Sequence, residues 1–122
     1  MTTILIVTGE ADSVAVWNGV LRQDGYRVVS ARNGLEGLVV ARKEKPALII
    51  TDRSMPLMDG VEFRRHLKSK RALARIPLIL ASAEPIEPRE LEIWDEIWLK
   101  PVSIETLRAS VQRLLNASHE AV

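Results

Sequence analysis

Three side chains that could perform chemistry together stand at the ends of short apolar runs: Asp52, Ser82 and Lys100. A carboxylate can act as a nucleophile and form an acyl phosphate. A lysine can neutralise the incoming oxyanion, and a serine hydroxyl can donate a hydrogen bond to it. Transfer of this kind usually also uses Mg²⁺, which prefers oxygen ligands. If these three ends meet in space, the residue types are compatible with a site at which a carboxylate attacks a phosphoryl group.

Five apolar runs alternate with five helical patterns along the chain. Strands are expected at residues 4–7, 26–30, 47–51, 76–81 and 97–99. Helices are expected after a cap at Asp12 or Ser13, after Asn33, after a cap at Asp59, within residues 89–96, and after a cap at Ser103. This alternation predicts an α/β fold, a doubly wound five-stranded parallel sheet with helices on both faces. Ligands of such sheets bind at the carboxyl ends of the strands, where the three polar residues stand.

Size and composition narrow the class of protein. The 122 residues predict a single domain with its core at about residues 3–116 and a fraying tail over 117–122. There is no cysteine, and neither a membrane-spanning run nor a leader is evident, so we expect a cytoplasmic protein. The net charge of +1 gives no general attraction to nucleic acid or membranes, and neither is expected to bind directly.

The sequence around Asp52 carries a more specific pattern. In the stretch D-R-S-M-P-L-M-D-G, Asp52 is followed by a Met-Pro pair and then by Asp-Gly, while Ser82 ends L-I-L-A-S and Lys100-Pro101 follows the fifth apolar run. With these motifs in order, the chain resembles the receiver domain of two-component response regulators over about residues 3–116. The resemblance implies a flavodoxin-like (β/α)5 fold and a signalling role rather than an enzymatic one.

The resemblance also assigns roles to individual residues. It implies that Asp52 accepts a phosphoryl group from a histidine kinase or a phosphotransfer protein. Ser82 and Lys100 would contact that group, and Pro101 would follow a cis peptide bond that aims Lys100. The metal ligands would include Asp52 and the backbone of Ser54.

Two departures from the family pattern change these expectations. Receivers usually end their first strand in an acidic pair that holds Mg²⁺, whereas Thr8 and Gly9 stand here, with Glu10 as a remaining candidate ligand. We therefore expect weak Mg²⁺ binding, and a direct pairing of Lys100 with Asp52 at rest. The switch position that usually carries Tyr or Phe is Ile97, and strand alternation directs the neighbouring Trp98 to the other face.

Alternatives remain open at this point. The altered site is also compatible with a degenerate receiver that acts as a phosphorylation-independent interaction module, and more remotely with a flavodoxin-like cofactor binder. A downstream protein partner is expected on the face formed by strand five and the last helix, where a homodimer could also form. Trp94 and Trp98 are candidate partner contacts, Trp17 is expected in the core, and His66 and His119 are expected at the surface.

Overall fold

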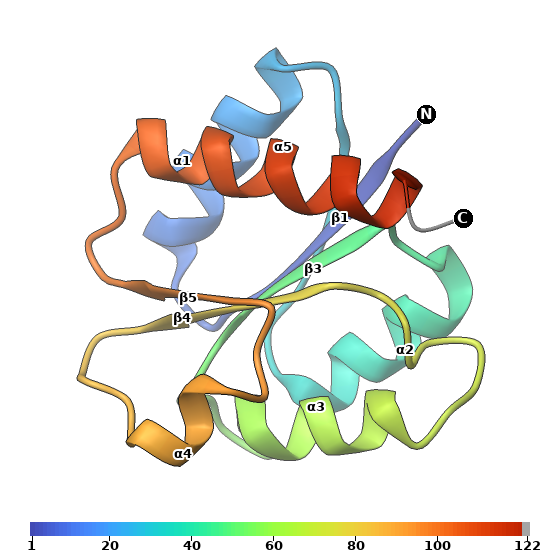
Figure 1. The fold of residues 1–122 in the computed structure, drawn as a ribbon, viewed down its shortest axis with the longest axis vertical. Coiled ribbons are helices and arrows are strands. Elements are labelled where there is room, and N and C mark those ends of the chain that lie inside the picture. Colours follow the sequence, from blue (N-terminus) through green and yellow to red (C-terminus); the bar gives the residue numbers. More distant parts are fainter. Residues whose placement is uncertain (121–122) are drawn as a thin grey trace.

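The protein is a three-layer α/β domain in a computed structural model that describes residues 1–120, with side chains described as far as Ala117 (Figure 1). Five parallel strands form one sheet in the order β2-β1-β3-β4-β5. They are β1 (Thr3–Val7), β2 (Arg27–Ala31), β3 (Leu48–Asp52), β4 (Leu78–Ser82) and β5 (Glu96–Leu99). The predicted doubly wound parallel sheet is therefore confirmed.

Helices cover both faces of the sheet. They are α1 (Ala11–Gln23), α2 (Gly34–Glu44), α3 (Gly60–Lys68), α4 (Pro88–Leu91) and α5 (Ile104–Glu120). Figure 1 shows α1 and α5 side by side over one face and α2 and α3 over the other. The central strands β1, β3 and β4 are buried on both faces, which explains why they are continuous apolar runs rather than alternating ones.

Two apolar cores result from this layering. Trp17 and Trp98 lie in the core under α1 and α5, where their rings meet edge to face at a centroid distance of 5.9 Å. Phe63 and Trp94 lie in the core under α2 and α3. Ile97 packs against this second core, so the expectation that Ile97 and Trp98 face opposite ways is confirmed.

The structure corrects the proposed partner role of two tryptophans. Trp94 is 5% exposed and Trp98 is 2% exposed, so both are core residues and cannot form a docking surface. Arg64 explains part of this burial, because its Nε donates to the Ile93 carbonyl at 2.8 Å while its guanidinium lies over the Trp94 ring. The indole N–H of Trp98 donates to Glu96 and to Ser110 across to α5.

Several element ends differ from the expected ones. Strand β4 begins at Leu78 rather than at residue 76, because Pro77 has no N–H to donate. Strand β3 extends one residue further than expected and includes Asp52. The predicted cap of α1 at Asp12 or Ser13 is wrong, since the helix begins at Ala11 after Glu10.

We also compared two predicted helix caps and the predicted end of the last helix with the structure. Asp59 accepts from the N–H of Glu62 at 2.9 Å, and Ser103 accepts from the N–H of Thr106 at 3.1 Å, so both predicted caps are confirmed. Helix α5 continues to Glu120, past the point where a fraying tail was expected. The rest of that tail, residues 121–122, and the His119 side chain lie outside the described part of the structure.

Over residues 1–120, no helix combines the length and apolar character that crossing a membrane requires.

Candidate functional site

The polar residues singled out in the sequence meet at one edge of the sheet. Asp52 is the last residue of β3, Ser82 is the last residue of β4, and Lys100 follows β5. Together with Glu10 and Ser54 they line a cavity of about 460 Å³. The parallel sheet brings them together because it places the carboxyl ends of all its strands at the same edge.

Lys100 binds two carboxylates at this edge. Its Nζ lies 2.7 Å from Oδ1 of Asp52 as an ion pair and donates a hydrogen bond of 2.7 Å to Oε1 of Glu10. The peptide bond between Lys100 and Pro101 is cis. The direct pairing of Lys100 with Asp52 and the cis bond were both expected from the sequence.

The surroundings keep Lys100 charged. Burial by itself lowers the pKa of Lys100, but the hydrogen bonds and charges of Asp52 and Glu10 outweigh burial, and the pKa is raised above its ordinary value of 10.5. The same contact lowers the pKa of Glu10, with a smaller contribution from the Ser13 hydroxyl. Lys100 is therefore an ammonium ion where it contacts Asp52 in this structure.

The lowered pKa of Glu10 predicts that the free energy of unfolding depends on pH. A group whose pKa is lowered by folding stabilises the fold above its unfolded pKa and loses that contribution as the pH falls through its folded pKa. For Glu10, whose ordinary pKa is 4.5, we expect Glu10→Gln to destabilise the protein at neutral pH by less than about 1 kcal/mol, because the Glu10 carboxylate is largely exposed. Urea unfolding of both proteins should show this difference vanishing well below pH 4.5. A difference that persists in acid, or one matched by Glu36→Gln in the first turn of α2, would rule out the ion pair as its cause.

Thr8 is the residue that sequence reasoning missed. It follows β1, is 2% exposed, and its hydroxyl donates a hydrogen bond to Oδ2 of Asp52. The same hydroxyl accepts from the N–H of Glu10 at 3.0 Å, which fixes its direction. The sequence showed only that an acidic side chain was missing at this position. It could not show that a hydroxyl replaces metal coordination with a hydrogen bond to the carboxylate.

Ser82 makes both of its hydrogen bonds with its own loop. Its Oγ donates to the carbonyl of Glu84 at 2.6 Å and accepts from the N–H of that residue at 3.2 Å. The residue is buried but lines the cavity beside Asp52. Sequence reasoning placed Ser82 at the correct edge, and its hydroxyl is held by the loop rather than by Asp52.

The donors present do not fit a tightly held Mg²⁺ ion. Within residues 1–120, no three carboxylate, histidine or cysteine side chains are grouped to hold a metal. The two nearby carboxylates, Asp52 and Glu10, both bind the ammonium of Lys100, and Thr8 bonds the second oxygen of Asp52. A hard divalent cation requires several oxygen ligands free of other cations.

Comparison with known proteins places this geometry in a family. The family model described as "Response regulator receiver domain" matches residues 4–112. The chain belongs to the response regulator receiver domains. The fold and the resemblance predicted from the sequence are thereby confirmed.

Individual relatives of this receiver domain differ in length. The chain is 32% identical over 120 residues to the alkaline phosphatase synthesis transcriptional regulatory protein PhoP of Bacillus subtilis, covering 97% of this chain but 50% of PhoP. It therefore spans only half the length of that relative. It is 31% identical to the sporulation initiation phosphotransferase F of Bacillus subtilis, covering 92% of each chain. Among solved structures, the receiver domain of a signal transduction histidine kinase from Syntrophus aciditrophicus superposes with a TM-score of 0.87 at 32% identity, covering 96% of this chain and 92% of that one.

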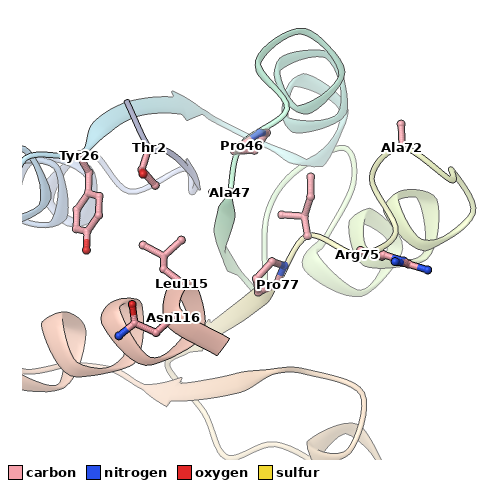
Figure 2. A pocket seen from close by; sticks show the side chains of 10 residues that line it. Thr2, Tyr26, Pro46, Ala47, Ala72, Arg75, Pro77, Leu115 and Asn116 are labelled. Atoms are coloured by element: carbon pink, nitrogen blue, oxygen red, sulfur yellow. The ribbon is translucent and has the colours of Figure 1, made fainter. Parts of the chain in front are cut away.

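A larger cavity of the receiver domain lies at the opposite edge of the sheet, away from Asp52. It measures about 600 Å³, and Figure 2 shows its lining, in which Thr2, Tyr26, Ala47 and Pro77 come from segments that precede strands. Among the side chains described as far as Ala117, those that line it include no carboxylate that could act as a nucleophile. The smaller cavity, which contains Asp52, therefore remains the candidate functional site.

Proposed function

We propose that Asp52 accepts a phosphoryl group from a histidine kinase or a phosphotransfer protein in a two-component pathway. The observation that supports this most directly is the buried Asp52 carboxylate, 3% exposed, beside Lys100 in a cavity at the carboxyl edge of the sheet. The arrangement supplies a nucleophile and a fixed countercharge, which are two parts that phosphoryl transfer requires.

The proposed step uses one oxygen of Asp52. Because Thr8 bonds Oδ2, we assign the attack to Oδ1, which is shielded from solvent under Lys100. Lys100 must therefore move toward Glu10 before the donor can approach. The oxygen then forms a P–O bond while the P–N bond of the donor phosphohistidine breaks. The histidine nitrogen takes the bonding electrons, and the ring leaves as a neutral imidazole that carries its proton on the other nitrogen. The ammonium of Lys100 neutralises charge on the transferred oxygens.

The proposal also covers the binding of Mg²⁺, the cellular location and the downstream partner. We propose that Mg²⁺ binds weakly, through Asp52, the backbone of Ser54 and Glu10. The signal would pass in the cytoplasm to a downstream protein or a second copy on the β5–α5 face, which exposes Leu99 and Ile104. The protein would receive the phosphoryl group as a signal, without turnover of a substrate and without direct contact with nucleic acid or a membrane.

The proposal is tested by incubation with the small phosphodonor phosphoramidate, with and without Mg²⁺, followed by intact-mass measurement. We expect the wild-type protein to gain the mass of one phosphoryl group, and Asp52→Asn to gain none. Asp12→Asn, which changes an exposed carboxylate in α1, should behave as wild type. Absence of any gain in the wild-type protein would contradict the proposal, as would a full gain in Asp52→Asn.

A further inference from the structure

A second cation lines the cavity that contains Asp52, and in this structure it is ion-paired with a carboxylate of α4. Arg53 directly follows Asp52, and its guanidinium binds the Glu90 carboxylate of α4 through Nη2 at 2.8 Å and Nε at 3.3 Å. This two-point contact is the geometry in which arginine recognises carboxylates and phosphates. Neither the sequence pattern nor the proposed transfer step assigned a role to either residue.

Only the side chain of Arg53 is free to move. Its N–H donates to the Ala81 carbonyl at 3.1 Å, and its carbonyl accepts from the N–H of Gly60 at 2.8 Å. The backbone is therefore fixed between β4 and the start of α3. The guanidinium is half exposed at the cavity rim and can rotate about its own side-chain bonds.

This contact is one of the few that can hold helix α4 in place. It spans only Pro88–Leu91, and none of these four described residues is buried. A helix this short has little stability of its own, so its place is set by tertiary contacts. The ion pair of Glu90 with Arg53 joins α4 directly to the residue that follows Asp52.

The charges of the residues that line the cavity favour a change in the ion-pair partner of Arg53 when Asp52 is phosphorylated. Among the described residues that line it, the acidic side chains are Glu10, Asp52, Glu84 and Glu87, and the cations are Arg53 and Lys100. Phosphorylation replaces the single charge of Asp52 by about two and adds oxygens that accept strong hydrogen bonds. Lys100 already contacts two carboxylates, so Arg53 is the second cation of the lining that could neutralise the added charge.

We infer that Arg53 exchanges Glu90 for the phosphoryl group on Asp52 and thereby releases α4. Arg53 is thus a second phosphoryl-binding cation, and the Arg53–Glu90 pair holds α4 at rest. This inference rests on the proposed phosphorylation of Asp52. It identifies a coupling between the site and α4 that needs no aromatic ring at position 97.

The first test concerns the resting protein. We expect Glu90→Gln to accelerate hydrogen–deuterium exchange in a peptide covering residues 86–93, because the amide leaves Arg53 with a weaker partner. Glu92→Gln makes the same chemical change at an exposed position two residues further on and should exchange as wild type. Equal exchange in Glu90→Gln and the wild-type protein would overturn the role of the pair in holding α4.

The second test adds the phosphoryl group. After treatment with phosphoramidate, we expect the wild-type protein to show the faster exchange of residues 86–93, whereas Arg53→Gln shows it already at rest and gains nothing further. The aspartyl phosphate of Arg53→Gln should also decay about tenfold faster, since a charge-assisted hydrogen bond is lost. Arg89→Gln, which removes a cation from α4 itself, should keep the wild-type lifetime.

The outcomes separate the two proposals. A wild-type protein that gains phosphoryl mass but shows unchanged exchange in α4, or an Arg53→Gln variant with wild-type lifetime, would overturn the exchange of partners alone. A wild-type protein that gains no mass would overturn the proposed function, and the exchange of partners with it.

Discussion

Replacing Thr8 with aspartate is expected to raise the affinity for Mg²⁺ by at least about tenfold. The Thr8 hydroxyl lies in hydrogen-bond contact with Oδ2 of Asp52, so an aspartate there would place two carboxylates side by side. Two like charges about 4 Å apart repel by about 4 kcal/mol near a protein surface, and a divalent cation relieves that repulsion. The same repulsion should make Thr8→Asp less stable than the wild-type protein without Mg²⁺ and restore part of the loss with it.

The measurement can use an intrinsic probe. The ring of Trp17 lies 5.9 Å from Nζ of Lys100, so a cation that displaces Lys100 should alter tryptophan fluorescence during a Mg²⁺ titration. Thr8→Asn is the matched control, because it has nearly the same shape and no charge. Equal Mg²⁺ affinity in Thr8→Asp and Thr8→Asn would show that position 8 does not limit metal binding.

Replacing Gly60 with alanine is expected to destabilise the fold by about 3 kcal/mol. Gly60 begins α3, and a Cβ there would collide with the carbonyl oxygen of Asp52 and lie 3.1 Å from the Cα of Arg53. Both neighbours are backbone atoms held by the sheet and cannot move aside as a flexible side chain could. Because the collision is with Asp52 itself, the phosphoryl gain of the folded fraction should fall as well.

A second glycine provides the control for Gly60. A Cβ on Gly19, in the middle of α1, would meet no atom within 4 Å. Gly19→Ala should therefore stabilise the protein by about 0.5–1 kcal/mol, since alanine favours the helix. Urea unfolding compares the two variants, and a Gly60→Ala protein as stable as the wild type would show that the backbone at Asp52 can yield.

Local sequence signals predicted local structure well. Asp59 and Ser103 were expected to cap helices and do so, because a cap needs only a side chain and an N–H two or three residues away. The caps proposed at Asp12 or Ser13 failed for a nonlocal reason. Glu10 stands at the start of α1, where Lys100, from 90 residues further along the chain, holds its carboxylate and Ser13 donates to it.

Whether a given tryptophan lies at the surface or in the core was harder to predict from the sequence. Trp94 precedes β5 and Trp98 lies within it, and their spacing of four residues alone fits either exposure or burial. The structure buries both in opposite cores, because Trp98 faces α5 while Trp94 lies beside α3 under Arg64. Which face a strand residue covers depends on helices that are distant in sequence.

The sequence by itself determined that Asp52, Ser82 and Lys100 share one edge of a parallel sheet, because the parallel direction of the strands follows from the alternation of apolar runs and helices. It also determined that the usual acidic pair is missing. Only the tertiary structure decided what takes its place: the Thr8 hydroxyl bonds one oxygen of Asp52, and Lys100 pairs with the other. It alone showed that Arg53 reaches α4. Contacts of this kind depend on the directions of side chains from separate elements, which no spacing within one element encodes.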